Sequence, residues 1–408
     1  MTKDVYVQLK GILDTVNKAV VRLRKLGPKE YMKAVSLLTG DLYSAVSAVN
    51  LQLLDDDSVD FCDMNYLEGR ITDCVHKDEL IKQYKLWYGT MSDILEEQYH
   101  ALNSWDEKFI KLMNRVKYVD FDRLVDSAKC SLMKLDDEVR DKLCAYYHGL
   151  EDMWGTLDIA NERYDVITNR ITALKEHRED FIWLYGRLGD WRSRMVLVSI
   201  LYNWITFELD YIYDMKEANF TDYFDLDLVQ CGEEEVVVDL GAWTGDSMQN
   251  YINTYSKYKK IYCYEIDKIS MEAAKKNLAE YSNIEFRNKG VGSRTGLMYL
   301  AGNPMSSGNK VVSVNTGFEI EVVSLDDDIT EKVTLIKMDI EGAEQEALLG
   351  CRRHIEEEMP KLLISVYHNN EDIWKIPRMA EEMNSEYRFY LRSNGSQWGP
   401  AEIVFFAL

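Results

Sequence analysis

The chain has 408 residues, which is long enough for two domains that each bury a core. It carries 48 Lys and Arg against 70 Asp and Glu, and the net charge of −22 disfavours nucleic acid or an anionic membrane as main partner, because phosphate groups attract basic side chains. Seven cysteines without a C-x-x-C pair indicate reduced thiols, not a disulfide framework or a zinc site. We recognise no signal peptide and no transmembrane segment, so we expect a cytoplasmic protein.

Residues 1–219 are predicted to form an all-α helical domain. Apolar residues recur at helical spacing from Leu9 to Leu23, and Gly27-Pro28 ends this first segment. The histidines are scattered, without the i,i+4 pairs of a metal site. The domain could form a homo-oligomer, dock an acceptor or only stabilise the protein. Further helical segments are expected over residues 29–54, 78–116, 120–147 and 151–175.

The segment 190–213 is strongly apolar, with Arg192 and Arg194 near its start, and is predicted to form one helix. We expect the last helices of the first domain, about 173–219, to pack on a second domain over residues 220–408. The stretch 220–232 would then lead into the first strand of that domain.

The second domain is organised around VVVDLGAWTGD, residues 236–246. An apolar β-branched run predicts a buried parallel strand, and Gly241 and Gly245 then flank a tight turn before a helix over 246–256. The next strand, 261–266, delivers Glu265 at its carboxyl end, where such folds hydrogen-bond ribose hydroxyls. Because the dinucleotide fingerprint G-x-G-x-x-G is absent, a ligand with ribose but without phosphates fits better. S-adenosylmethionine is the common one.

Strand and helix signals alternate through the rest of the domain and predict a mainly parallel, doubly wound sheet. One of the helices, over residues 270–281, is expected to have Ser270 as its N-cap. The last two strands have no helix between them and must form an antiparallel hairpin. This Rossmann-like α/β arrangement is that of class I methyltransferases. Further strands are expected over residues 284–287, 297–300, 311–323, 333–338, 361–366, 387–392 and 401–407, with helices from about 343 and over 371–383.

Polar residues stand at the carboxyl ends of five predicted strands. They are Asp239, Glu265, Asn288, Asp339 and His368. Since ligands of open parallel sheets bind beyond these ends, we expect the five side chains to surround one site.

Several of these motifs resemble the FkbM-type methyltransferases. IKMDIEGAEQEALLG (residues 336–350) resembles the signature of that family, and VVVDLGAWTGD, YCYEID and SLDD occur in the same order. The segments 364–377 and 387–392 are similar to one bacterial branch of the family. The likeness covers about residues 190–408 and does not extend to the first 150 or so. One departure is Ile266-Asp267, where the family usually has a proline after the glutamate.

The resemblance implies S-adenosylmethionine as cofactor and methyl transfer to a hydroxyl, often on a sugar, glycan or natural product. By matching position, Asp239, Gly241 and Gly245 would line the methionine end of the cofactor. Glu265 would bind the ribose, and Asn288 the adenine.

Methyl transfer to a hydroxyl requires in-line positioning and a base, or a metal that lowers the pKa of the hydroxyl. His368 could be this base, or could only fix the loop around it. Asp339 and Glu341 could contact the methyl donor, orient His368 or hold a divalent cation, and Glu341 could instead cap the following helix. We assign no metal to these two carboxylates. Arg392 could bind an anionic acceptor group or form a surface ion pair.

The sequence therefore predicts an S-adenosylmethionine-dependent O-methyltransferase that acts on a sugar, glycan or glycosylated biosynthetic intermediate. The alternative is an interaction or scaffold protein whose helical domain binds a partner and whose methyltransferase fold is inactive. Polar residues at every expected strand end favour the enzyme.

Overall fold

The computed structural model describes residues 104–217, 220, 223–301, 310–312, 319–395 and 398–408. The helices predicted before residue 104 lie outside this part of the chain. The described residues belong to two compact units. The first includes residues 104–135, 170–178 and 204–207, and the second includes residues 136–169, 179–203 and most of 208–408. The predicted domain boundary at residues 219 and 220 stays a prediction.

In the first unit, helices α5 (Ser104–Tyr118) and α6 (Phe121–Lys134) bury one apolar face each, including Leu112 and Leu124. Arg178 donates a hydrogen bond of 2.8 Å to the carbonyl of Met113, which fixes the end of α5 within the unit.

The helical region is more interrupted than the sequence predicted. The expected segment 120–147 is two helices, α6 and α7 (Asp137–His148), because Asp136 caps a new helix by accepting a hydrogen bond from the Glu138 amide. Residues 151–175 contain a two-stranded hairpin, which strands of two residues are too short to reveal in a sequence. The hairpin consists of β1 (Leu157–Asp158) and β2 (Arg163–Tyr164). Helix α8 (Glu151–Trp154) precedes it and helix α9 (Asp165–Glu176) follows it.

The predicted helix over 190–213 is likewise wrong as a single element. It consists of α11 (Trp191–Thr206) and α12 (Asp210–Met215), separated at Phe207, whose φ of 58° no α-helix accommodates. Helix α10 (Arg178–Arg187) precedes them.

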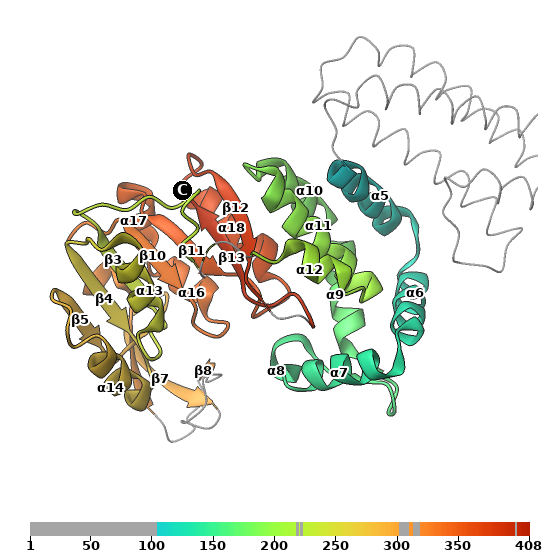
Figure 1. Ribbon diagram of the computed structural model, residues 1–408, viewed down its shortest axis with the longest axis horizontal. Coiled ribbons are helices and arrows are strands. Elements are labelled where there is room, and N and C mark those ends of the chain that lie inside the picture. Colours follow the sequence, from blue (N-terminus) through green and yellow to red (C-terminus); the bar gives the residue numbers. More distant parts are fainter. Residues whose placement is uncertain (1–103, 218–219, 221–222, 302–309, 313–318, 396–397) are drawn as a thin grey trace, which may run out of the picture. The chain divides into compact units, whose positions relative to one another are not determined.

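A seven-stranded sheet forms the centre of the second unit, in the order β12-β13-β11-β10-β3-β4-β5 (Figure 1). Neighbours from β11 to β5 are parallel, while β13 runs antiparallel to β11 and β12. This confirms the class I methyltransferase fold and its antiparallel C-terminal hairpin. The strands are β3 (Val236–Leu240), β4 (Lys260–Tyr264), β5 (Ile284–Arg287), β10 (Leu335–Met338), β11 (Lys361–Ser365), β12 (Phe389–Ser393) and β13 (Ile403–Ala407).

Helices connect the parallel strands, as the alternating pattern predicted. The N-cap expected at Ser270 is wrong: α14 begins earlier, and its cap is Asp267, whose carboxylate accepts a hydrogen bond of 2.7 Å from the Ser270 amide. These helices are α13 (Asp246–Tyr255), α14 (Lys268–Asn277), α15 (Leu325–Asp328), α16 (Glu344–Leu349), α17 (Arg352–Glu358) and α18 (Asp372–Met383).

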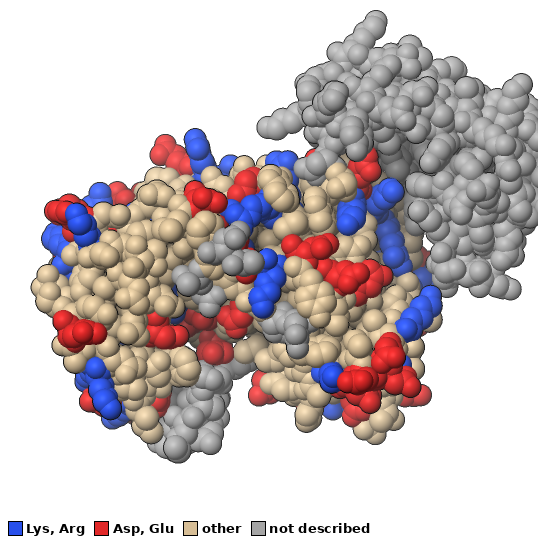
Figure 2. Space-filling view, in the orientation of Figure 1, with Lys and Arg blue, Asp and Glu red and all other residues tan. Residues whose placement is uncertain are grey.

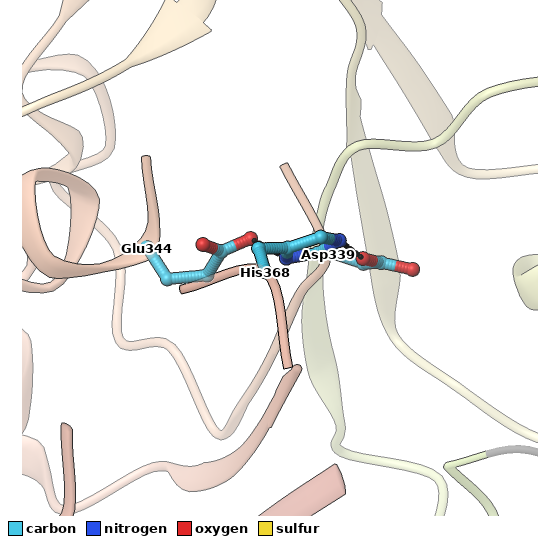
Figure 3. Close-up of side chains that lie close together, drawn as sticks. All are labelled: Asp339, Glu344 and His368. Carbon is cyan, nitrogen blue, oxygen red and sulfur yellow. Dashed lines mark ion pairs between the residues drawn. The ribbon is translucent and has the colours of Figure 1, made fainter. Parts of the chain in front are cut away.

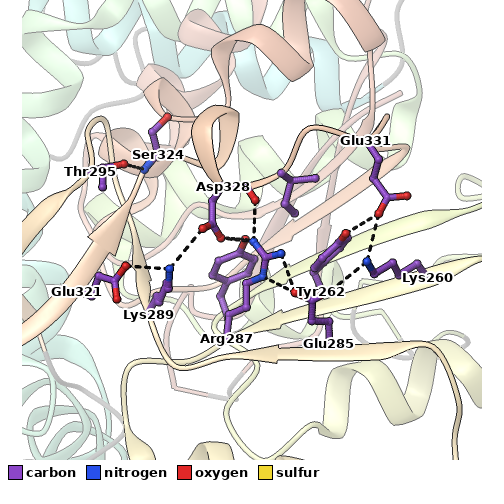
Figure 4. A network of polar contacts seen from close by, with 12 residues as sticks. Lys260, Tyr262, Glu285, Arg287, Lys289, Thr295, Glu321, Ser324, Asp328 and Glu331 are labelled. Carbon is purple, nitrogen blue, oxygen red and sulfur yellow. Dashed lines mark hydrogen bonds and ion pairs between the residues drawn. The ribbon is translucent and has the colours of Figure 1, made fainter.

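The β-rich stretch after β5 forms a separate sheet in the order β6-β9-β7-β8. A network of charged side chains joins β5 to this small sheet and to α15 (Figure 4). Lys289 lies 2.8 Å from Glu321 and 3.4 Å from Asp328, and Asp328 also pairs with Arg287. The four strands are β6 (Gly290–Val291), β7 (Gly296–Ala301), β8 (Lys310–Val312) and β9 (Glu319–Val323).

Arg392 on β12 is buried, so the surface ion pair considered for it is wrong. Its guanidinium lies 2.8 Å from the Asp190 carboxylate and 2.6 Å from that of Asp225, and it also donates to the Ser193 hydroxyl. The Gly189 amide donates to the Phe389 carbonyl at 2.8 Å. These contacts fix the start of α11 to the edge strand of the sheet. The two carboxylates that pair with Arg392 belong to the protein itself and not to a ligand.

No helix within the described residues is both long and apolar enough to cross a membrane. On the face shown in Figure 2, acidic and basic side chains are mixed over the described surface. The described cysteines Cys130, Cys144, Cys231, Cys263 and Cys351 are free thiols.

Candidate active site

A cavity of about 340 Å³ lies at the carboxyl ends of β3, β4 and β10. One end, the glycine-turn end, is formed by Gly241, Trp243, Glu265 and Asp267. The other, the histidine end, is formed by Asp339 and Glu341, with His368 and Glu344 buried behind them. Acidic residues outnumber basic ones among the described lining: Asp246, Glu265, Asp267, Asp339, Glu341 and Glu402 against Lys289 and Lys337. Such a cavity favours a cationic ligand over a phosphate.

The two glycines of the turn are required by the backbone. Gly241 has a φ of +84°, and a Cβ there would lie 1.8 Å from the carbonyl oxygen of Asp339. Gly245, with a φ of +82°, packs against Leu278 outside the cavity lining. The absent side chain of Gly241 therefore lets β3 and β10 approach closely and exposes backbone to the cavity.

Glu265 is fixed by two backbone amides. Its Oε2 accepts a hydrogen bond from Trp243 and its Oε1 accepts one from Asp267, each at 2.8 Å. Burial raises the pKa of Glu265 above its usual value, although these amide bonds oppose the shift. Each carboxylate oxygen keeps a second lone pair, so the side chain can still accept hydrogen bonds from ligand hydroxyls.

Asn288 is exposed and does not line the cavity. Its amide donates to the backbone carbonyls of Glu265 and Ile266, at 2.7 and 3.1 Å. Asn288 therefore holds the loop that carries Glu265 in place. The departure from the family at Ile266-Asp267 leaves this arrangement intact.

Asp239 is fully buried behind the cavity wall. One carboxylate oxygen lies 3.0 Å from the ammonium of Lys337, and the other accepts a hydrogen bond from Ser247. Lys337 also donates to the Gly241 carbonyl at 2.9 Å. Burial alone would lower the pKa of Lys337, but Asp239 and Asp339 outweigh it and the pKa is raised. The ammonium thus ties the central strands to the glycine turn.

Asp339 lies directly after β10 at the histidine end. Its Oδ2 accepts a hydrogen bond of 2.7 Å from the hydroxyl of Tyr223. Burial would raise the pKa of Asp339, but Lys337, His368 and the Tyr223 hydroxyl reverse the shift, so the carboxylate stays ionised.

His368 is buried between carboxylates (Figure 3). Its Nδ1 lies 2.9 Å from Glu344, and its Nε2 lies 3.4 Å from Asp339 and 3.7 Å from Glu341. Burial lowers the pKa of His368, but Glu344 and then Asp339 and Glu341 outweigh it and raise the value to about 9. A protonated imidazole has no free lone pair, so the base predicted here would act only once the ring has lost its proton.

Neighbouring elements hold the histidine loop. Trp154 of α8 donates a hydrogen bond of 2.8 Å to the Tyr367 carbonyl. Glu344, at the start of α16, accepts a hydrogen bond of 2.9 Å from the Ile340 amide while it contacts His368. One buried carboxylate thus fixes both the loop after β10 and the imidazole after β11.

Sequence reasoning missed Lys337, Glu344 and Tyr223. Lys337 carried a signal, because a lysine inside the apolar run of a buried strand needs an anionic partner. Glu344 stands among several acids of a helix start, where its burial has no sequence signal. Tyr223 lies in the stretch predicted as a linker.

Comparison with known proteins identifies the sheet-bearing part of the chain. Residues 231–397 match the Methyltransferase FkbM domain family. The crystal structure of methyltransferase FkbM from Methylobacillus flagellatus KT is similar to 67% of this chain and 72% of that chain, with 26% identity and a TM-score of 0.53. No curated protein matches the sequence.

Other solved structures share less. An rRNA methylase from Streptococcus thermophilus matches 43% of this chain and 86% of its own, at 13% identity and a TM-score of 0.30. Fibrillarin from Aeropyrum pernix, with natively bound S-adenosyl-L-methionine, matches 44% of this chain and 70% of its own, at 11% identity and a TM-score of 0.29. Likenesses this slight say nothing about activity.

The matched residues include the parallel strands β3, β4, β5, β10 and β11 of the central sheet and most of the residues that line the cavity. Residues 231–397 are therefore an FkbM-type methyltransferase domain on a class I methyltransferase fold.

Proposed function

We propose that this protein is an S-adenosylmethionine-dependent O-methyltransferase that acts on a hydroxyl of a sugar, glycan or glycosylated biosynthetic intermediate. The observation that carries the proposal is the acidic cavity lined mostly by the FkbM-type domain, with a glycine turn at one end and a carboxylate-held histidine at the other. The hydroxyl and the sugar come from the family resemblance of the motifs.

The glycine-turn end suits the methyl donor. Glu265 would accept hydrogen bonds from the ribose hydroxyls, and Gly241 would let the methionine part lie against the backbone. Three of the predicted cofactor residues would support this end of the cavity without contacting the cofactor, because they do not line the cavity: Asp239, Gly245 and Asn288. The surplus of acids would stabilise the sulfonium and disfavour the pyrophosphate of NAD.

The histidine end would receive the acceptor. Asp339 and Glu341 line the cavity and can accept hydrogen bonds from an acceptor hydroxyl, while His368 holds the Asp339 carboxylate from behind. Methyl transfer then requires the acceptor oxygen in line with the sulfur–carbon bond and a group that removes the hydroxyl proton. We propose Asp339, Glu341 and His368 for these tasks. A cytoplasmic location and self-association through the helical domain stay predictions.

The test is methyl transfer by the full chain from radiolabelled S-adenosylmethionine to fractionated bacterial glycans and glycosylated small molecules, followed by identification of the labelled atom. We expect label on a carbohydrate oxygen. Label on nitrogen or carbon would contradict the O-methyl assignment. Donor binding without transfer to any fraction would favour the scaffold alternative, and absence of donor binding would contradict the cofactor.

A further inference from the structure

Three residues at the histidine end carry buried polar atoms that the protein leaves without hydrogen bonds. Among the described residues, both ring nitrogens of His368, Oδ1 of Asp339 and Oε2 of Glu344 form no well-aligned hydrogen bond, although the ring nitrogens lie within ion-pair distance of Glu344 and Asp339. His368 is 1% exposed and Glu344 is 0% exposed. Buried polar atoms are almost always hydrogen-bonded, so a group of them aimed at one another calls for a further partner.

The geometry of these residues fits a metal ion. One ligand atom each from Asp339, Glu344 and His368 lies within 4.8 Å of the other two (Figure 3). This is close to the span of about 4 Å across the ligand shell of an ion with bonds of about 2.0–2.2 Å. Small side-chain movements would therefore bring the three atoms onto a common ion.

The charge around His368 points to the same partner. Three carboxylates, those of Glu344, Asp339 and Glu341, lie within 3.7 Å of the ring nitrogens. Even a charged imidazole supplies one positive charge against three negative charges at a largely buried position, because the nearby Lys337 ammonium is already paired with Asp239. A divalent cation would balance this group, and it would bind one of the two ring nitrogens together with carboxylate oxygens of Asp339 and Glu344.

We infer that a divalent transition-metal ion binds between His368, Asp339 and Glu344, with Glu341 beside it at the cavity wall. One imidazole nitrogen with carboxylate oxygens suits Mn²⁺ or Zn²⁺, whereas Ca²⁺ prefers six to eight oxygen ligands. Because Asp339 lines the cavity, an open coordination position can face the acceptor.

The role of the ion rests on the proposed function, although its binding does not. A hydroxyl oxygen on the ion would lose its proton to water more readily. That oxygen then forms a bond to the methyl carbon as the bond from this carbon to the sulfonium sulfur breaks. The products are the methyl ether and the neutral thioether S-adenosylhomocysteine.

The test is calorimetric titration of Mn²⁺ into the metal-stripped full chain, without donor or acceptor. We expect one saturable site per chain, with affinity at least about 10-fold lower in Glu344→Gln and His368→Gln. Glu346→Gln, the same change at an exposed position of the same helix, is the matched control and should bind Mn²⁺ as the wild type does. Ca²⁺ should bind more weakly than Mn²⁺.

The Glu341→Gln variant keeps the test valid if a variant at a buried position fails to fold. It should fold, because the Glu341 side chain is 29% exposed and the change is isosteric. We expect a weaker Mn²⁺ site in it as well. Absence of saturable Mn²⁺ binding in the wild type would overturn the inference, as would equal affinity in all four variants. Methyl transfer undiminished by a chelator would remove the catalytic role while leaving the proposed function standing.

Discussion

At the glycine-turn end of the cavity, the polar groups are fixed by backbone amides, whereas at the histidine end they are charged side chains fixed by one another. The Glu265 carboxylate accepts hydrogen bonds from the main-chain N–H groups of Trp243, in the glycine turn, and of Asp267, two residues further along the chain. His368 instead depends on Glu344 and Asp339, which follow a different strand. Main-chain groups hold the first end, whereas charged side chains that follow different strands hold the second.

This difference separates what each end can do. A rigid frame of amides suits a cofactor whose ribose and amino acid do not change during the reaction. A cluster of acids around an imidazole can take up and release a proton, as deprotonation of an acceptor hydroxyl requires. Substitutions at the two ends should therefore affect different measurements, and four variants test this from the largest expected effect to the smallest.

The His368→Ala variant should lower turnover by roughly 10²–10⁴-fold, because the acceptor proton would lose its route of removal. Donor affinity should stay near that of the wild type, since the imidazole lies at the other end of the cavity. Single-turnover methyl transfer and calorimetry measure the two quantities. His148→Ala, at an exposed histidine, is the control. Full turnover in His368→Ala would remove this residue from the reaction.

The Gly241→Ala variant should lower the free energy of unfolding by about 2–4 kcal/mol, because the new Cβ meets the Asp339 carbonyl and the residue has a positive φ. Urea denaturation measures the change. Gly232→Ala is the matched control, since a Cβ there meets nothing within 4 Å. Equal stability of the two variants would show that the close approach of β3 and β10 is not rigid.

The Glu265→Ala variant should weaken binding of S-adenosylhomocysteine by about 1–3 kcal/mol, because hydrogen bonds to an ionised carboxylate are lost. Glu272→Ala, on the exposed surface of α14, is the control for the removal of one acid. Calorimetry gives both affinities. Unchanged binding in Glu265→Ala would mean that the ribose lies elsewhere.

The Asp190→Asn variant should affect neither end selectively and should lower the free energy of unfolding by about 1–2 kcal/mol at pH 7. Burial raises the pKa of Asp190, but Arg392 and Ser193 outweigh it, so the folded-state pKa is lowered. The carboxylate thus stabilises the fold above its unfolded pKa of about 4, and this contribution is lost as the pH falls through the lower folded value. Urea denaturation at pH 7 and pH 3 should show the difference from wild type shrinking at the lower pH. A difference that is equal at both would contradict the ion pair with Arg392.

The same contrast explains how far the sequence could lead. The order of strands and the positions of Gly241, Glu265 and Asp339 follow from buried runs that end in glycine or an acid. The roles of Asp239 and Asn288 do not follow from the sequence. A shift of one residue along the end of a strand decides whether a side chain faces the cavity or is turned away from it. The burial of Glu344 and the carboxylates around His368 arise only when segments before and after β11 meet.

The most direct test of the two-ended cavity is a crystal structure of the full chain with S-adenosylhomocysteine. We expect the ribose hydroxyls within hydrogen-bond distance of the Glu265 carboxylate and the sulfur directed towards Asp339. A ligand bound outside this cavity, or bound in it with the ribose against Asp339 and His368, would contradict the account.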